Sequence, residues 1–128
     1  MLIFREPQVI LFSEDLARAV EFYAGLGFTE TFRVPDEGPP IHVDLVLDGY
    51  KIGIATADSC RDDHNLDPVT DGQCAAVILW TDDTAAAYSE LIARGAPAVA
   101  APHVWLGRLL IAWTADPDGN PVQIVQSL

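Results

Sequence analysis

Two ionisable side chains that could act together, His42 and Asp44, stand two residues apart within the apolar stretch 41–47. An extended strand sends alternate side chains to the same side, so an imidazole and a carboxylate at this spacing share a face. Such a pair can be a general base oriented by a carboxylate. It can equally be a polar lining of a cavity, and the sequence leaves both interpretations open.

The turn that follows this stretch fixes the expected neighbours of the pair. Asp-Gly at 48–49 is typical of a two-residue hairpin loop between two strands. With that loop, Asp44 lies opposite Gly53 and His42 lies opposite Ala55, and opposed residues share a face of the sheet. Small residues across from the pair predict open space beside the imidazole and the carboxylate.

The rest of the chain offers no predicted catalytic residue. Ser13 and Thr81 precede apolar helical patterns and are interpreted as helix caps. Cys60 and Cys74 lack metal-ligand spacing and are expected to be free thiols. We therefore predict no nucleophile, no metal site and no cofactor.

The elements that must position these residues follow from hydrophobic periodicity. Strands are expected at 7–12, 28–34, 41–47, 51–57, 73–80, 98–101, 108–115 and 121–126, with helices from Ser13 to Gly25 or Gly27 and from Thr81 to about Arg94. The Asp-rich stretch 58–72 is a linker or a lid. Trp105 falls in a loop at 102–107, and Trp113 is expected beneath the second helix.

The order strand, helix, strand, strand, strand occurs twice because the chain repeats itself. Ser13-Glu14-Asp15 recurs as Thr81-Asp82-Asp83 at an offset of 68 residues, and Asp48-Gly49 recurs as Asp118-Gly119 at an offset of 70. Repetition at a fixed distance is typical of duplicated structural units. The chain is therefore predicted to hold two copies of one βαβββ module.

Composition excludes several classes of partner. The 128 residues are 50% hydrophobic and carry 19 acidic against 7 basic side chains, a net charge of −12. That charge repels phosphate backbones and anionic lipid, so neither nucleic acid nor membrane is an expected partner. No window approaches the roughly 20 apolar residues of a membrane span, and the N-terminus lacks the pattern of a secretory signal. A cytoplasmic location is expected.

These motifs together resemble the vicinal oxygen chelate superfamily, which includes glyoxalase I, extradiol dioxygenases and bleomycin-resistance proteins. The resemblance is carried by the paired modules, by Asp15-Leu16 and Phe22-Tyr23 in the first helix, and by the closing Asp116–Pro121 turn. It implies an α+β fold in which two tandem βαβββ modules form an open, mostly antiparallel, eight-stranded barrel-like sheet with the helices outside. One domain over 1–128 is expected, with module one at about 1–58, a linker at about 59–72 and module two at about 73–128.

The resemblance also implies where metal-dependent relatives hold their ion, with one ligand on the first strand and one on the last strand of each module. These positions are Gln8 and Gly53 in the first copy, and Ala76 and Gln123 in the second. Glycine and alanine side chains offer no lone pair, and a neutral amide is a weak ligand. A metal site of the family type is therefore not expected.

Strand alternation from these positions predicts a cavity lined by polar and aromatic side chains. The candidate ligand-binding residues are Gln8, Phe12, His42, Asp44, Trp80, Trp105, Thr114 and Gln123. Phe12 and Trp80 could instead fill a core, and Trp105 could cover an interface. Thr114 is included because counting back from Asp118-Gly119 places it opposite Gln123.

The resulting hypothesis is a protein of the bleomycin-resistance type, which would bind and sequester an aromatic or hydrophobic natural product without converting it. The resemblance further implies a homodimer. A metal-independent lyase or isomerase using His42 and Asp44 is the competing interpretation. A regulatory binding module with a collapsed cavity is a third.

Overall fold

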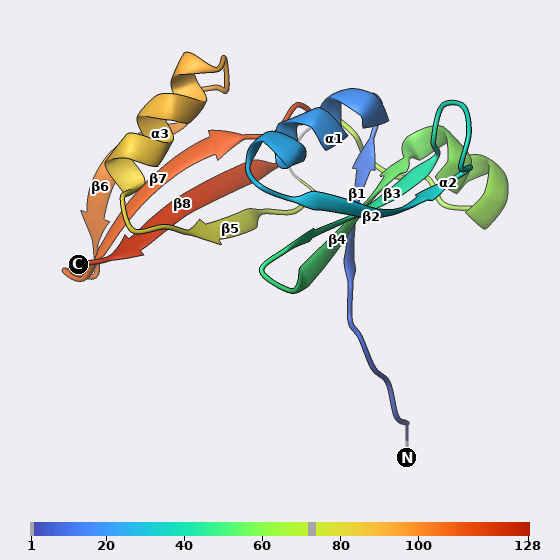
Figure 1. Cartoon of the computed structure of the whole chain (residues 1–128), viewed down its shortest axis with the longest axis horizontal. Coiled ribbons are helices and arrows are strands. Elements are labelled where there is room, and N and C mark those ends of the chain that lie inside the picture. The colour runs from blue at the N-terminus through green and yellow to red at the C-terminus, as the bar shows by residue number, and fades with distance from the viewer. Residues whose placement is uncertain (1, 72–73) are drawn as a thin grey trace. The chain divides into compact units, whose positions relative to one another are not determined.

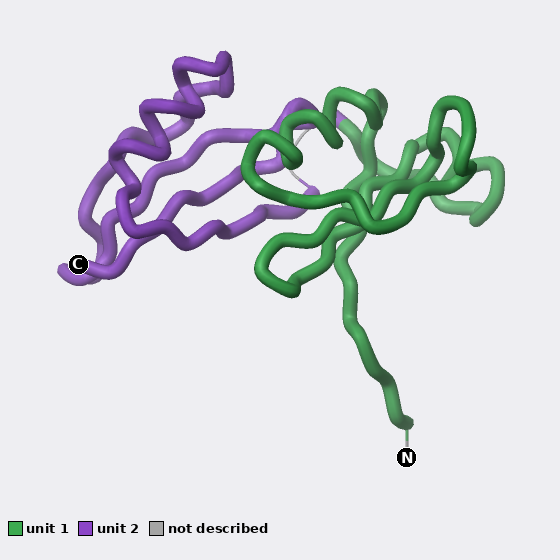
Figure 2. Tube along the Cα trace, viewed as in Figure 1, with its two compact units in different colours: residues 1–70 green, residues 71–128 purple. Residues whose placement is uncertain are grey.

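The computed structural model describes residues 2–71 and 74–128. They form two compact units, unit 1 up to Thr70 and unit 2 from Asp71 (Figure 2). Gly72, assigned to the linker, and Gln73, assigned to the fifth strand, lie outside the described residues. Both units contain the predicted order of strand, helix and three strands.

Unit 1 is a four-stranded sheet with a helix packed on one side (Figure 1). Its elements are β1 Val9–Ser13, α1 Leu16–Gly25, β2 Thr29–Val34, β3 His42–Leu47, β4 Tyr50–Thr56 and α2 Ala57–His64. The strand order is β1-β4-β3-β2. β1 runs parallel to β4, whereas β3 is antiparallel to both of its neighbours.

Unit 2 repeats this arrangement with β5 Val77–Trp80, α3 Thr84–Ala93, β6 Ala100–Trp105, β7 Leu109–Ala115 and β8 Pro121–Ser127. Its strand order is β5-β8-β7-β6, with β5 parallel to β8. The predicted α+β class is confirmed, but the described ladders form two four-stranded mixed sheets, not one open eight-stranded sheet. The first strand of each unit pairs with the last strand of the same unit.

The helices begin two residues later than predicted, in the same way in both units. Asp15 is the N-cap of α1 and accepts a hydrogen bond from the backbone N–H of Arg18 at 3.2 Å. Asp83 is the N-cap of α3 and accepts from Ala86 at 3.0 Å. The predicted cap Ser13 instead accepts from the N–H of Asp15 at 3.1 Å. A carboxylate two positions later captures the helix N–H groups, which is why Ser13 and Thr81 are not the caps.

The core of unit 1 lies between α1 and the face of β3 and β4 that α1 covers. Tyr23, Val43 and Leu45 are fully buried and Ile54 is 1% exposed. Tyr23 packs edge-on against the rings of Phe22 and Phe28, with centroids 5.2 and 5.5 Å away. Because the large apolar side chains are buried on this side, the opposite side of the sheet is available to carry polar side chains and a binding site.

The stretch predicted as a linker or lid begins with a helix, α2. Thr56 caps it by accepting from the N–H of Ser59 at 3.2 Å, and Asn65 ends it in the left-handed conformation with φ 55°. Cys60 is buried within it. None of the described helices has the length and apolar character that crossing a membrane requires.

An outer strand of each sheet is irregular. In unit 1 the pairing of β2 with β3 shifts between Glu30 and Phe32. In unit 2 the pairing of β6 with β7 shifts between Ala100 and His103, where Pro102 has no N–H to donate. β6 is longer than predicted, so Trp105 ends a strand rather than standing in a loop.

Candidate functional site

Three predicted site residues meet on the face of the unit 1 sheet opposite α1. Gln8 immediately precedes β1, whereas His42 and Asp44 are on β3. The amide Nε2 of Gln8 lies 2.8 Å from Oδ1 of Asp44, and Nε2 of His42 lies 2.7 Å from the same oxygen. We call these three residues the Asp44 cluster.

The hairpin register that predicted this meeting is confirmed. Asp44 pairs with Gly53, His42 pairs with Ala55, and the loop is the Asp-Gly at 48–49 with φ of 51° and 80°. Positive φ at both loop positions is the geometry that Asp-Gly accommodates in a tight hairpin. The local sequence therefore dictates that His42 and Asp44 face the small residues of β4.

Gly53 lets the cluster sit close to the backbone of β4. A methyl group built at Gly53 would lie 2.8 Å from Nε2 of Gln8, 3.1 Å from Cε1 of His42 and 3.2 Å from Cγ1 of Ile10. These approaches are shorter than ordinary van der Waals contact. The space that a side chain at position 53 would need is therefore filled by the cluster itself.

Asp44 carries an ionised carboxylate. Burial alone raises the pKa of this carboxyl group, since it disfavours the charged form. Hydrogen bonds from His42 and then from Gln8, with smaller attractions from His42 and Lys51, outweigh that effect. The pKa of Asp44 consequently lies below its ordinary value.

Because this pKa is lowered in the folded protein, Asp44 should contribute stability above its unfolded pKa of about 3.9 and lose that contribution as the pH falls through the folded pKa. In Asp44→Asn we expect the free energy of unfolding to depend less on pH below about pH 5. Urea titrations at a series of pH values measure this, with Asp63→Asn on exposed α2 as the matched control. Parallel pH curves for wild type and Asp44→Asn would contradict the assignment.

Apolar side chains surround the cluster on the same face. Ile10, Phe32 and Val34 are 43, 53 and 38% exposed, and the ring of Phe32 lies 6.3 Å from that of His42 at 63°. Phe12 is on this face as well, since it pairs with Ala55, and it is half-buried. Phe32 was not among the predicted site residues. The pairing shift between Glu30 and Phe32 puts its ring on this face, and regular alternation in 28–34 would have placed it on the core side with Phe28.

The residues at the metal-ligand positions do not fit a catalytic divalent ion. Gly53 and Ala76 have no donor atom, and the amide of Gln8 donates its hydrogen to Asp44. Gln123 is a single neutral amide, a poor ligand beside carboxylate or imidazole. Within residues 2–71 and 74–128, no group of three or more His, Cys, Asp or Glu side chains is placed to hold an ion.

Unit 2 corrects two expectations about β7. Thr114 pairs with Val122, and it is Trp113 that pairs with Gln123. Thr114 is fully buried and donates a hydrogen bond to the carbonyl of Pro97 at 2.8 Å, so it lies on the α3 side. The predicted pairing of Thr114 with Gln123 and the predicted place of Trp113 beneath the helix are both wrong.

Both errors come from the length of the turn between β7 and β8. Ala115 pairs with Pro121, so five residues form the loop where the count from Asp118-Gly119 had assumed two. Asp116 holds this loop by accepting from the backbone N–H groups of Asp118 and Asn120 at 3.0 and 2.8 Å. Shifting the register by one residue exchanges the faces of a strand. Trp113 thereby joins Gln123 on the face opposite α3.

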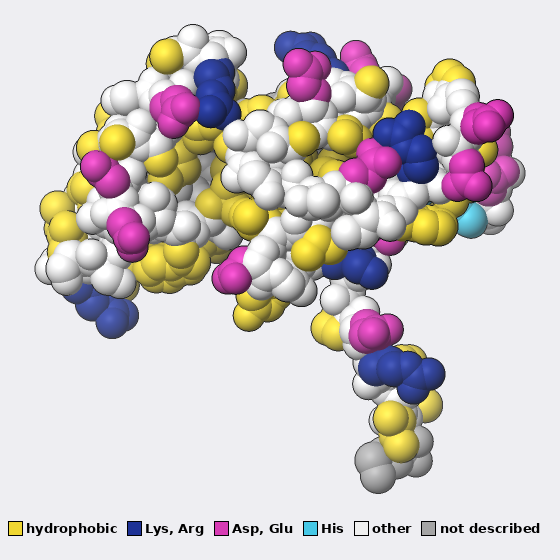
Figure 3. All heavy atoms as spheres, viewed as in Figure 1, with side chains coloured by type: hydrophobic (Ala, Val, Ile, Leu, Met, Phe, Trp, Pro, Cys, Tyr) yellow, Lys and Arg dark blue, Asp and Glu magenta, His cyan; other side chains and the backbone are white. Residues whose placement is uncertain are grey.

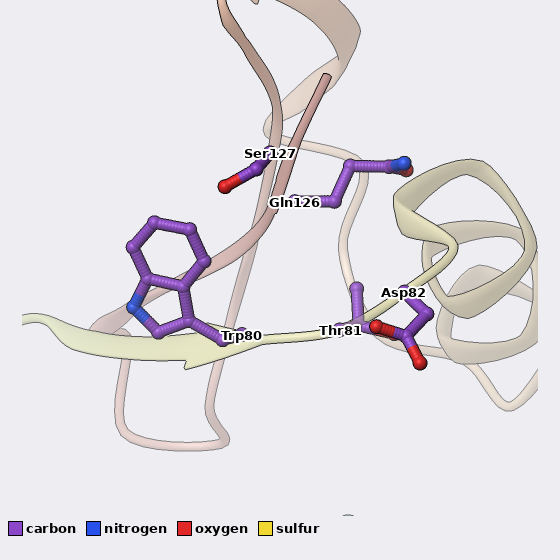
Figure 4. A pocket seen from close by; sticks show the side chains of 5 residues that line it. All are labelled: Trp80, Thr81, Asp82, Gln126 and Ser127. Atoms are coloured by element: carbon purple, nitrogen blue, oxygen red, sulfur yellow. The ribbon is translucent and has the colours of Figure 1, made fainter.

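Trp80 borders an open hollow of about 530 Å³ in unit 2, together with Thr81, Asp82, Gln126 and Ser127 (Figure 4). Trp80 is 65% exposed, so it is not part of a core here. Figure 4 shows its indole on the side of Ser127, while the amide of Gln126 points the other way. That amide accepts from the N–H of Thr84 at 2.7 Å and so stabilises the start of α3.

Trp105 is 54% exposed at the end of β6, beside Val104 and Leu106 at 59% each. Its neighbour Leu106 has a positive φ of 56°, which makes the turn into β7. The structure thus places Gln8, Phe12, His42 and Asp44 on one face of unit 1. Trp80, Trp105, Thr114 and Gln123 belong to unit 2.

The charge of the chain favours cationic over anionic ligands. Acidic side chains appear on the visible face of both units in Figure 3 (magenta), in keeping with the net charge of −12. Such a field attracts cations over a distance that salt shortens. Among the described residues, Lys51 of β4 is the lysine or arginine whose attraction lowers the pKa of Asp44.

A model of the Glyoxalase/Bleomycin resistance protein/Dioxygenase superfamily matches residues 6–124. A search of curated protein sequences gives no match.

Solved structures share the fold at low sequence identity. Hypothetical protein SA1046 from S. aureus has a TM-score of 0.80 at 17% identity, covering 97% of this chain and 95% of that chain. TioX from Micromonospora sp. ML1 has a TM-score of 0.77 at 22% identity, covering 98 and 100%. Lactoylglutathione lyase from Agrobacterium tumefaciens has a TM-score of 0.73 at 20% identity, covering 95 and 92%. At such identities the likeness establishes the fold alone.

Proposed function

The chain belongs to the Glyoxalase/Bleomycin resistance protein/Dioxygenase superfamily, and within it we propose a metal-independent protein that binds and sequesters a hydrophobic or aromatic small molecule. The observation that carries the proposal is the Asp44 cluster. Gln8 donates to Asp44 at 2.8 Å and fills the space beside Gly53, where the resemblance would place a metal ligand. Because the amide of Gln8 is hydrogen-bonded to Asp44, this position suits the orientation of a bound molecule better than the binding of a catalytic metal ion.

The apolar surroundings of the cluster support an aromatic ligand. Three large apolar side chains, Ile10, Phe32 and Val34, stand partly exposed around a few convergent polar groups. Pockets for small molecules commonly combine apolar walls with a few polar groups that fix orientation. An aromatic ligand stacked on Phe32 would gain roughly 0.5–1.5 kcal/mol beyond the burial of its area.

The biological role we propose is protection from a natural product, in the manner of bleomycin-resistance proteins. The support for sequestration is the chain's own donor set, in which Gly53 and Ala76 have no donor atom and Gln8 is hydrogen-bonded to Asp44. A homodimer in the cytoplasm completes the proposal.

Titration with aromatic antibiotics tests it. Among bleomycin-like, mitomycin-like, quinoxaline and enediyne compounds, we expect at least one saturable ligand with a Kd below about 100 μM, or about −5.5 kcal/mol. Calorimetry gives the affinity, and mass spectrometry should recover the compound unchanged. Absence of binding across the panel, or a stoichiometric transition metal in the purified protein, would overturn the proposal.

The hydrogen bond between His42 and Asp44 favours one second candidate, a metal-independent lyase or isomerase. A carboxylate 2.7 Å from Nε2 orients the imidazole as it would for a general base. This candidate requires a chemically altered product whose formation is lost in His42→Ala. Unchanged ligand after long incubation would exclude it for the compounds that bind.

A further inference from the structure

The carboxylate of Asp44 determines that both of its hydrogen-bond partners, Gln8 and His42, act as donors. An ionised carboxylate only accepts hydrogen bonds, so both nitrogen atoms close to Oδ1 must donate. Nε2 of Gln8 is the amide nitrogen, so the amide oxygen Oε1 is the atom of this side chain that is left to accept a hydrogen bond. Nε2 of His42 likewise carries a hydrogen and donates it to Oδ1.

The cluster consequently keeps two acceptor atoms for a ligand. Oε1 of Gln8 and Oδ2 of Asp44 both carry lone pairs, and the charge of Asp44 makes its oxygen the stronger acceptor. In the described part of the chain, no hydrogen bond to Oε1 of Gln8 or to Oδ2 of Asp44 is formed. The Asp44 side chain is 12% exposed and Gln8 is exposed, so the cluster is open to solvent.

Resting on the proposed function, we infer that the ligand of the Asp44 cluster is a cation with several N–H donors on an aromatic body. An amidinium, a guanidinium or a primary ammonium supplies the hydrogen atoms that the acceptors lack. Hydrogen bonds between such groups and a carboxylate are roughly twice as strong as neutral ones. The aromatic body lies against Phe32 and Ile10, which flank the cluster.

An anionic ligand meets the opposite conditions at this site. Its oxygen atoms would face the acceptors of the cluster and the charge of Asp44, and Lys51 is the lysine or arginine of the described residues that offsets this charge. The net charge of −12 adds repulsion at a distance. Lys51 is exposed and attracted to Asp44, so it competes with a cationic ligand for the same carboxylate.

Three probes with one aromatic body test the inference: 2-naphthamidine, 2-naphthamide and 2-naphthoate. They present a cation, a neutral amide and an anion on the same ring system. Titration followed by ¹H–¹⁵N spectra of the full chain gives each Kd, and shifts of the Gly53 amide show that binding is at the cluster. We expect the amidine to bind about tenfold more tightly than the amide, which is about 1.4 kcal/mol, and the carboxylate to bind most weakly.

Variants assign that preference to Asp44. Asp44→Asn keeps the shape but removes the charge, and should reduce the amidine-to-amide ratio to about twofold or less. Asp63→Asn removes the same charge from exposed α2 and should leave the ratio unchanged. Lys51→Met should tighten amidine binding about threefold, because the competing cation is gone.

The outcomes separate this inference from the proposed function. Equal binding of the three probes, or preference for the carboxylate, would leave a binding site for aromatic molecules but overturn its cation preference. An Asp44→Asn protein that keeps the full amidine preference would also overturn it. If none of the probes shifts the Gly53 amide, both the inference and the proposed binding at this cluster fail.

Discussion

Gly53→Val is expected to dismantle the Asp44 cluster while the fold of unit 1 survives. The first added carbon would stand 2.8 Å from Nε2 of Gln8, the flexible end of a side chain, and 3.1 Å from the ring of His42. Gln8 must therefore leave Asp44, and His42 must shift. We expect a loss of about 1–3 kcal/mol in the free energy of unfolding. Affinity for any ligand of the cluster should fall by more than about tenfold, since its orienting groups are displaced.

A double variant tests whether Gln8 is the residue with which a side chain at position 53 collides. Adding Gln8→Ala to Gly53→Val removes the nearest clashing group, so part of the lost stability should return. The coupling between the two substitutions, measured by urea unfolding of both single variants and the double variant, should be at least about 0.5 kcal/mol. Additive effects would show that Gln8 does not occupy this space.

Tyr23→Ala is expected to have the largest effect on stability in unit 1. Tyr23 belongs to α1, is fully buried and packs edge-on against Phe22 and Phe28. Truncating a large buried aromatic ring leaves a cavity and costs about 3–5 kcal/mol. Chemical denaturation monitored by circular dichroism measures the change.

Tyr50→Ala provides the matched control, because Tyr50 is 79% exposed at the start of β4. Its truncation should change stability by about 0.5 kcal/mol or less. Similar denaturation midpoints for the two variants would show that α1 does not hold its sheet through Tyr23. The comparison tests the packed side of the sheet independently of the ligand-binding side.

The unit 1 site was predictable because short-range rules determine it. The Asp-Gly loop at 48–49 fixed which residues of β3 and β4 are opposed, and alternation placed His42 and Asp44 on one face. The contact of Gln8 with Asp44 required more, namely the parallel pairing of β1 with β4. That pairing was not predicted from the sequence: the family resemblance implied only that Gln8 and Gly53 occupy metal-ligand positions. The superfamily itself is confirmed by the match over residues 6–124.

The unit 2 site was less predictable because its turn contains the same Asp-Gly pair as the unit 1 turn but is longer. Asp118-Gly119 resembles Asp48-Gly49, but the side chain of Asp116 binds two backbone N–H groups and organises a five-residue loop. A side chain that bonds the backbone locally changes a loop length without changing its composition. The single-residue slip moved Thr114 into the core and Trp113 out of it.

α2 shows a second reason why part of the structure could not be predicted from the sequence. Its eight residues are mostly polar, so hydrophobic periodicity gave no signal. Its ends did carry information: Thr56 caps the start, Asp58 occupies the first turn, and Asn65 ends the helix in the left-handed conformation. Short polar helices are identified by their caps, because they bury little apolar surface of their own.

The irregular pairing of β2 and β6 bears on how the protein behaves at high concentration. Both strands form an open edge of their sheet, where unpaired backbone groups could recruit another chain and start aggregation. The shift between Glu30 and Phe32, and the one around Pro102, interrupt the regular row of groups that a foreign strand would need. At these two edges, the interruptions oppose the growth of fibrils by a protein with many exposed apolar side chains.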